Sequence, residues 1–232
     1  MERIKIPVVI TLESPLHLGA GGGDVNADAE VVHEACGLPY FPAKRFRGLL
    51  HESALETAEM AERCGAHFLT KDTVDCLFGH KAESDVELVI SDFHLLPEGE
   101  EPGTCEQMKM SCRRLADELT AVEESTDITA HEVLLEYTSL RVQTSIDDRT
   151  GTTKDGSLRN MRCVNGGLRF AGLLEIAASE KDRKKYLGAA ALALQNLRAA
   201  GGKRSRGFGR ISCEMTEQDQ KALVKEALAH HE

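Results

Sequence analysis

Residues 201–210, GGKRSRGFGR, hold four glycines and four cations and no acidic residue. Glycine allows the backbone to turn through positive φ and to lie close to another chain, and the cations supply charge for a polyanion. The segment separates an apolar helical stretch from an alternating strand, so the chain must build a loop there. A phosphate backbone is the expected ligand. The alternative is a solvated basic turn in which Gly201 caps the helix, although this leaves Gly207 and Gly209 unexplained.

The charge of the chain is acidic overall, with 28 Lys and Arg against 38 Asp and Glu. Half of the cations nevertheless fall in three short segments, 44–47, 141–169 and 198–210. An acidic body with a few basic loops is typical of a protein that holds one polyanion on one face, and it argues against indiscriminate coating of nucleic acid. With no Trp and few other aromatic residues, the chain also lacks the material for a base-stacking platform.

Several classes of protein are disfavoured by composition. Seven scattered cysteines, an odd number, do not form the pattern of a disulfide framework and predict a reducing, cytoplasmic location. No apolar run approaches the length of about 20 residues that a membrane span needs, so no membrane partner is expected. The segment 150–157 lacks the GK[ST] ending of a nucleotide-binding loop, so no nucleotide cofactor is expected either.

The spacing of apolar residues predicts two β-α-β halves interrupted by insertions. Strands are expected at 3–12, 86–95, 140–146, 167–176 and 208–215, and helices from about residue 43, at 182–199 and at 216–232, with helical periodicity also at 105–124. Residues 130–138 fit a helix and a strand equally well. This order predicts an α+β fold with a ferredoxin-like (RRM-like) antiparallel sheet and helices on one face.

Three cations, Lys44, Arg45 and Arg47, cluster in the first turn of the helix that follows Pro42. Cations oppose the helix dipole at this end, whereas the unpaired backbone amides there favour an anion. A bound anion therefore explains the cluster better than the alternative, a solvated helix start.

A long basic connection joins the expected strands 140–146 and 167–176. It is longer than a hairpin turn, and long loops in compact domains are commonly functional or disordered. Its sequence, RTGTTKDGSLRNMR, predicts a finger that contacts a partner.

The motifs of this chain resemble those of the RAMP superfamily of CRISPR-associated proteins. They occur in the family's order: LHLGAGGGD, GLPYFPAKRFRGLLHE, CLFG before VELVISDFHL, TSIDDRTG and GGKRSRGFGR. The chain is similar in particular to the repeating backbone subunit of type III effector complexes, which binds guide RNA along a filament and cuts target RNA. It departs from the commonest form in having AKRFRG where many members have a Gly-Ser-Ser-Leu-Lys-Gly element.

The resemblance covers nearly the whole chain and implies a single RAMP domain at 1–232. It implies a core at about 1–60, 85–96 and 167–215, insertions at about 61–84 and 97–130, a β-hairpin thumb at about 141–169 and a C-terminal helix at 216–232. In the family the thumb inserts between guide and target and displaces a base pair.

The resemblance also implies where RNA binds. The matching residues are Lys44, Arg45, Arg47, Arg141, Arg149, Arg159, Arg162, Gly201, Gly202, Lys203, Arg204, Arg206, Gly207 and Gly209. The implied partners are guide CRISPR RNA, target single-stranded RNA and other effector subunits, including copies of this chain.

The family's cleavage aspartate lies in a loop before paired apolar residues and the LP element, and it matches Asp28 here. Asp24 is the reserve candidate, because the spacing to LP is one residue shorter in this chain. A single loop carboxylate could hold Mg²⁺ or another divalent cation, which usually keeps several waters and bridges to substrate phosphate. The alternative is a solvent-exposed aspartate in a polar turn.

Three functions are therefore open: an RNA-guided ribonuclease subunit, a structural guide-binding subunit in which Asp28 is idle, and a guide-processing endoribonuclease. Members of the last class often use histidine as acid or base, and His17 and His33 lie near the N-terminal loop.

Four further residues pose a metal hypothesis. Cys64, His67, Cys76 and His80 form CxxH followed by CxxxH, which supplies four nitrogen and sulfur donors for zinc. The alternative is that Cys76 is a small apolar core residue and that the four do not converge.

Overall fold

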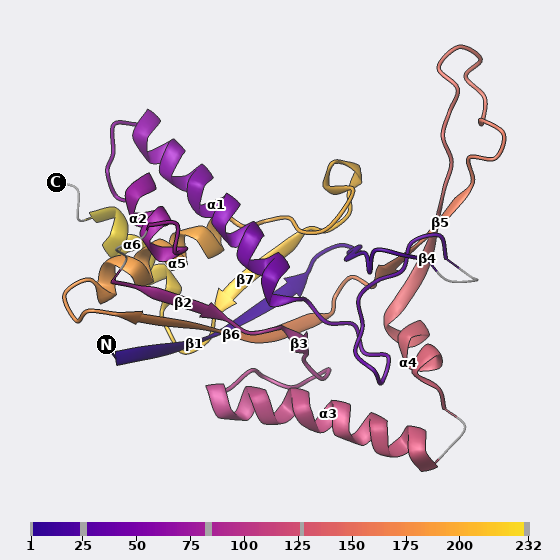
Figure 1. Cartoon of the computed structure of the whole chain (residues 1–232), viewed down its shortest axis with the longest axis horizontal. Helices are drawn as coiled ribbons and strands as arrows, with labels where there is room; N and C mark the ends of the chain where they lie inside the picture. The colour runs from indigo at the N-terminus through magenta and orange to yellow at the C-terminus, as the bar shows by residue number, and fades with distance from the viewer. Residues whose placement is uncertain (1, 24–26, 82–84, 126–127, 230–232) are drawn as a thin grey trace.

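The computed structural model of the chain describes residues 2–23, 27–81, 85–125 and 128–229 (Figure 1). The elements follow in the order β1 (Glu2–Leu12), α1 (Ala43–Arg63), α2 (Lys71–Leu77), β2 (Glu87–Ile90), β3 (His94–Leu95), α3 (Cys105–Ser125), α4 (Ala130–Tyr137), β4 (Thr138–Gln143), β5 (Arg159–Val164), β6 (Arg169–Ala178), α5 (Arg183–Asn196), the 3₁₀ turn η1 (Arg204–Arg206), β7 (Ile211–Met215) and α6 (Gln220–Ala229). None of the described helices combines the length and apolar character needed to cross a membrane.

The main sheet has the order β2-β6-β1-β7, with the short β3 also paired to β6. Every pair in it is antiparallel, and β1 runs beside β6 from Glu2 opposite Ala178 to Thr11 opposite Arg169. Without the inserted elements the order is β-α-β-β-α-β, as the apolar spacing predicts. The predicted α+β class with an antiparallel sheet is confirmed.

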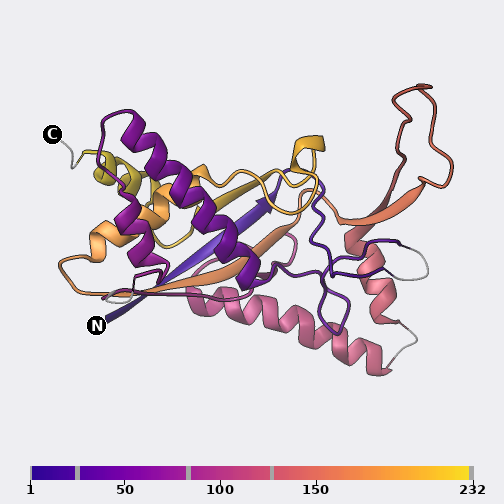
Figure 2. The same ribbon diagram turned by 45° about the horizontal axis from the view of Figure 1, so that its top comes forward.

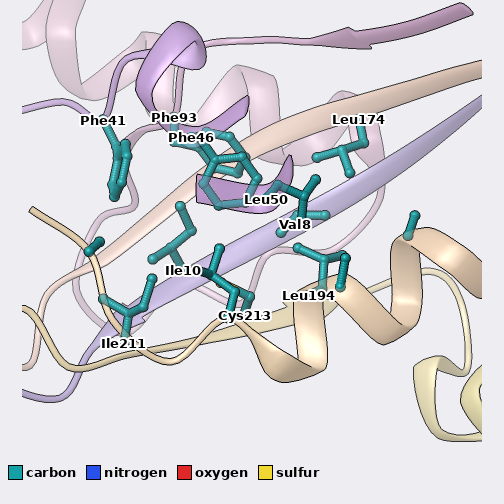
Figure 3. Close-up of a cluster of buried hydrophobic side chains, with 14 of the residues drawn as sticks. Val8, Ile10, Phe41, Phe46, Leu50, Phe93, Leu174, Leu194, Ile211 and Cys213 are labelled. Atoms are coloured by element: carbon teal, nitrogen blue, oxygen red, sulfur yellow. The ribbon is translucent and has the colours of Figure 1, made fainter. Parts of the chain in front are cut away.

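The core fills the space between one face of this sheet and the helices α1 and α5. Alternate residues of β1 point to that face, and Figure 3 shows Val8 and Ile10 gathered with Phe46 and Leu50 of α1 and Leu194 of α5. All five are buried. Burial of each such side chain stabilises the fold by about 1.5–3 kcal/mol, so this cluster holds α1 and α5 against the sheet.

Close packing between α1 and α5 brings the loop after α5 to the start of α1. The α5 sequence is rich in alanine, and the Ser53 hydroxyl donates a hydrogen bond of 2.7 Å to the Ala193 carbonyl across the interface. The Asn196 side-chain amide adds a 3.2 Å bond to the Ser53 hydroxyl. Because α5 ends beside the middle of α1, the next residues of the chain reach the first turns of α1.

The helix α3, which belongs to the insertion expected at about 97–130, covers the opposite face of the sheet (Figure 1). Val9, Ala171 and Leu173 point to that face and pack with Met108 and Cys112 of α3. The strands β1 and β6 are therefore apolar on both sides, and such strands need a cover on each face. The inserted segment before α4 supplies the second cover.

The expected thumb has different boundaries from those predicted. The β4 strand pairs with β5 from Thr138 opposite Val164 to Gln143 opposite Arg159, whereas β6 belongs to the main sheet. The prediction missed β5 because Arg162 interrupts its apolar pattern. Figures 1 and 2 show the hairpin and its connecting loop projecting away from the body.

The ambiguous stretch at 130–138 forms the helix α4. Thr129 and Glu132 form a capping box, in which each side chain bonds to the backbone N–H of the other residue. The helix then leads directly into β4, so α4 positions the base of the hairpin.

Candidate RNA interface

Three segments distant in sequence meet in one groove with a volume of about 600 Å³. The groove is lined by His17, Leu18 and Gly19 from the loop after β1, by Lys44, Arg45, Gly48 and Leu49 of α1, and by Gly201 and Gly202 of the glycine-rich loop. Both glycine loops and the basic helix start predicted from sequence therefore contribute to a single concave surface.

The glycines of the 201–210 loop serve first to pack one backbone against another. A β-carbon on Gly201 would lie 2.5 Å from the His17 carbonyl oxygen, and Gly202 donates a 3.1 Å hydrogen bond to that same oxygen. Gly201 does not cap the preceding helix, because α5 ends at Asn196. At Gly207 a β-carbon would meet no atom within 4 Å, so only its positive φ of 81° favours glycine.

The basic residues of this loop lie on its exposed side. Lys203 has a left-handed backbone with φ of 62°, and its Nζ donates to the Gln143 side chain at 2.6 Å. Arg204 lies 3.5 Å from the Glu52 carboxylate, while Arg206 has no ion pair with any described residue. With Arg210, which is also exposed, the loop thus presents four exposed cations, and the Lys203–Gln143 bond connects it to the hairpin.

The start of α1 already has an anionic partner within the chain. The Asp92 carboxylate accepts a 2.7 Å hydrogen bond from the Ala43 backbone N–H, which meets part of the need predicted for a bound anion. Lys44 is exposed, and Arg45 donates to the Gly19 carbonyl oxygen at 2.5 Å. Both side chains remain at the groove.

Arg47, unlike Lys44 and Arg45, does not line the groove. Its guanidinium donates to the carbonyl oxygens of Leu88 at 2.8 Å and Phe78 at 2.9 Å and lies over the Phe78 ring. Two positions along a helix turn a side chain through about 200°, so Arg47 points roughly opposite to Arg45, and the cluster seen in sequence is divided in the fold. Arg47 therefore has a structural contact in place of the predicted RNA contact.

The hairpin carries exposed cations on one face. The register places Arg141 beside Gln143, which lies opposite Arg159, so all three point to the same side of the β4–β5 pair. Because Lys203 bonds to Gln143, this face continues the basic surface of the glycine-rich loop. Arg149 lies farther out, in the exposed loop between the two strands.

Arg162 is the second predicted RNA-binding arginine that the fold uses differently. Its side chain is only 1% exposed, and its Nε bonds to both carboxylate oxygens of Glu30, at 2.7 and 3.0 Å. Arg162 faces the body because it lies on the side of β5 covered by the N-terminal loop. It is unavailable to a ligand at the surface.

Asp28 lies against the root of the hairpin. Its Oδ2 accepts a 2.7 Å hydrogen bond from the Asn160 backbone N–H, and its own N–H donates to the Asn160 carbonyl at 2.9 Å. Asp28 is exposed, and its Oδ1 has no hydrogen-bond partner among the described residues. One oxygen thus orients the carboxylate, and the other is left without a hydrogen bond within the described part of the chain. The reserve candidate, Asp24, lies outside the described residues.

A model of the RAMP superfamily matches residues 9–212. The chain belongs to the RAMP superfamily. Among solved structures, its fold is similar to a chain of the type III-B Cmr-beta bound to cognate target RNA, with a TM-score of 0.61, 14% identity, and coverage of 95% of this chain and 99% of that one. A chain of the apo state of type III-B Cmr-beta is similar with a TM-score of 0.63, 14% identity, and coverage of 94% and 98%. No curated protein matches the sequence at a significant level.

Two histidines of this RAMP protein are oriented by backbone carbonyls. His17 Nδ1 lies 2.7 Å from the Arg162 carbonyl oxygen, and His33 Nδ1 lies 2.8 Å from that of Glu34. A carbonyl only accepts, so Nδ1 carries the proton in each ring and Nε2 of the neutral form can accept one. Of the two, His17 lines the groove.

The four zinc candidates of this RAMP protein do not form a site. Cys64 and His67 are exposed near the end of α1, and the His80 ring packs 4.7 Å from that of His51. Across the described ranges, no three His, Cys, Asp or Glu side chains come together in a way that could hold a metal ion. None of the seven cysteines, all of them in the described ranges, forms a disulfide.

The sequence did not single out Glu30, Asn160 or Gln143, although each contributes to the interface. Glu30 follows Asp28 by two positions, so in an extended segment the two share a side; this is the one available signal. Asn160 contacts Asp28 only through its backbone N–H and carbonyl, which every residue type except proline has, so its identity gives no signal in the sequence. The position of Gln143 beside the glycine-rich loop depends on the register of the β4–β5 hairpin, which the sequence does not show.

Proposed function

We propose that this RAMP protein is the backbone subunit of a type III CRISPR effector complex, where it binds guide RNA and cleaves the target RNA paired with the guide. The observation that carries the proposal is the convergence of two glycine loops and the basic α1 start in one groove. Family membership and a fold similar to Cmr-beta bound to cognate target RNA support it.

Guide RNA follows the basic surface from the groove to the hairpin. Lys44 and Arg45 lie at one end, Lys203 and Arg206 in the middle, and Arg159 on the hairpin face, while Arg141 extends that face. These cations neutralise successive phosphates, and the acidic remainder of the chain repels RNA elsewhere. The partners are guide RNA, single-stranded target RNA and other subunits, including copies of this chain.

Cleavage is assigned to Asp28. Breaking an RNA strand requires in-line attack on phosphorus by the 2′-hydroxyl or a water, with the charge on the phosphoryl oxygens neutralised. The bond from Asn160 holds the carboxylate of the exposed Asp28 at the hairpin root. In this position the carboxylate can accept a proton or act as an electrostatic anchor beside a bound strand.

Asp28 could provide a divalent cation such as Mg²⁺ with a single protein ligand. Glu30, two residues away, is occupied by Arg162, and the described residues gather no set of three donors. A cation held by Asp28 would take its other ligands from water and RNA phosphate, as Mg²⁺ commonly does. When bound, it supplies positive charge for the phosphoryl oxygens.

The test uses the complex with its guide. Asp28→Ala should bind target RNA with unchanged affinity and should not cut it, whereas Asp148→Ala, which removes an exposed carboxylate from the hairpin loop, should cut normally. If the Asp28→Ala complex binds and cuts target RNA normally, the assignment to Asp28 is wrong. The chain is then a structural guide-binding subunit in which Asp28 is idle.

A guide-processing endoribonuclease is a further candidate, favoured by the position of His17 in the groove with Nε2 available as a base. Such an enzyme should cut repeat RNA as a free chain without metal, and His17→Ala should abolish that activity. His33→Ala provides the control, because the His33 ring is also oriented by a backbone carbonyl but does not line the groove. Metal-dependent cuts at regular spacing, absent from the free chain, would exclude this function.

A further inference from the structure

The ion pair between Arg162 and Glu30 lies in the interior, where a salt bridge is a poor source of stability. Its two side chains are 1% and 12% exposed. Removing two charges from water opposes folding, and an apolar pair of similar volume is often as stable or more stable. In addition, Arg162 Nη2 is buried and has no hydrogen-bond partner among the residues that the structure describes. The arrangement is therefore not optimised for stability.

Arg162 is the point at which three segments are joined. Its Nη1 reaches the Thr138 hydroxyl at 3.3 Å, its N–H donates to Ala29 at 2.9 Å, and its carbonyl meets His17 Nδ1 at 2.7 Å. The residue thus links the base of β4, the loop that carries Asp28, and the groove.

The loop and β5 run side by side as a short ladder. Asp28 exchanges hydrogen bonds with Asn160, and two residues farther along Glu30 is bound by Arg162. Ala29 and Met161 form the parallel bridge between them. Within the described residues, both hydrogen bonds of Asp28 are made to Asn160 of this strand.

We propose that the buried Arg162–Glu30 pair positions Asp28 by locking the register of its loop against β5. The inference rests on the proposed cleavage by Asp28. Arg162 and Glu30 are positioning residues and do not contact RNA. Their pairing has a defined length and direction, so it sets which residue of the loop lies opposite Asn160, a choice that apolar packing would leave open.

The test compares three variants with the wild type. Arg162→Met combined with Glu30→Met keeps the volume and removes both charges. Glu30→Gln keeps the shape and one accepting oxygen. Lys184→Met combined with Glu226→Met removes a surface ion pair of 2.9 Å and serves as the matched control. For each, we would measure thermal unfolding, RNA affinity, the cleavage rate of the complex at saturating target, and exchange of the Asn160 amide hydrogen.

The double Met variant should unfold cooperatively at an unchanged or higher temperature and bind RNA as the wild type does. Its cleavage rate should fall about tenfold or more, because small displacements of a catalytic group have large effects. Its Asn160 amide should exchange about tenfold faster, because that amide loses the Asp28 carboxylate. Glu30→Gln should recover most of the cleavage, and the surface pair should show no effect.

Wild-type cleavage by the double Met variant, or an Asn160 amide as protected as in the wild type, would overturn the positioning role. A parallel loss of folding and RNA binding in the double Met variant would assign the pair to stability instead. If Asp28→Ala cuts normally, the proposed cleavage fails, and the exchange rate of Asn160 still decides whether the pair holds the loop.

Discussion

Gly209 lies so close to Ala200 that a β-carbon on it would stand 1.9 Å from the Ala200 carbonyl oxygen. The two residues are also joined by a 2.8 Å hydrogen bond from the Ala200 N–H to the Gly209 carbonyl, and Gly209 donates to Pro15 at 2.8 Å. The glycine-rich loop is thus closed at its base by backbone contact, and its cations are carried outward from that closure.

Gly209→Ala should destabilise the protein far more than Gly207→Ala. Both glycines have positive φ, 71° and 81°, so each substitution costs about 1–2 kcal/mol for the left-handed backbone. Only at Gly209 would the new β-carbon also clash with a neighbouring segment of the backbone. Relieving that clash should raise the total loss of unfolding free energy to about 3 kcal/mol or more. Urea unfolding measures the difference. Equal losses would show that the loop base can move apart freely.

Arg47→Ala should lower stability and Lys44→Ala should lower RNA affinity. Arg47 donates to two backbone carbonyls, so its loss should lower the free energy of unfolding by about 2 kcal/mol and leave RNA affinity unchanged. Lys44 is exposed in the groove, so its loss should weaken RNA binding and leave stability unchanged. Thermal unfolding and filter binding test both. Weaker binding by a fully stable Arg47→Ala would restore Arg47 to the RNA path.

Simultaneous replacement of Lys203, Arg204 and Arg206 by Ala should flatten the salt dependence of RNA binding. For a single-stranded nucleic acid, each phosphate contact contributes about 0.7 to the slope of log affinity against log salt, so the slope should fall by about 2. The control is replacement of Lys71, Lys109 and Lys181, which are exposed on other elements. An unchanged slope in the first variant would remove the loop from the RNA path.

The His94–Glu34 pair should make stability fall as the pH rises. The hydrogen bond from His94 Nδ1 to Glu34 Oε1, 2.8 Å long, raises the pKa of His94 above its ordinary 6.5, and the Asp92 charge adds to the effect against the opposing effect of burial. The bond to protonated His94 therefore stabilises the protein fully below pH 6.5. This stabilisation is lost as the pH rises through the raised pKa of His94 in the folded state.

His94→Gln should abolish the loss of stability that occurs as the pH rises above 6.5. Urea unfolding midpoints measured below and above this pH test the prediction. His51 provides a check on sign, because burial and the neighbouring His80 lower its pKa. Its contribution is therefore present at higher pH and is lost as the pH falls below 6.5. A pH profile of His94→Gln identical to that of the wild type would mean that the Glu34 bond is not maintained in solution.

Elements with a regular apolar spacing could be predicted from sequence. The strand at 3–12 appears as Glu2–Leu12, and the helical periodicity at 105–124 appears as Cys105–Ser125. The strand Arg159–Val164 was not predicted, because its burial depends on the loop that crosses it and its arginine pairs with a glutamate far away in sequence. Pairing partners separated by more than a hundred residues leave no local pattern.

The candidate site shows the same division. Cations and glycines mark the segments that meet in the groove, and these are visible in the sequence because composition alone concentrates charge there. Which arginines face the groove is not visible. Arg47 and Arg206 have the same charge and are both in basic clusters, yet one bonds to interior carbonyls and the other is exposed.

The sequence by itself determined the β-α-β-β-α-β order of the main-sheet strands and their helices, the acidic body with basic loops, and the resemblance to RAMP proteins, since all three depend on residue type and local spacing. Only the tertiary structure decided that Arg162 pairs with Glu30, that Asp28 is oriented by the Asn160 amide, and that Gly209 closes a loop. The reason is physical: direction and burial of a side chain are set by neighbours that folding brings from distant parts of the chain, and those neighbours determine whether a charge serves structure or ligand.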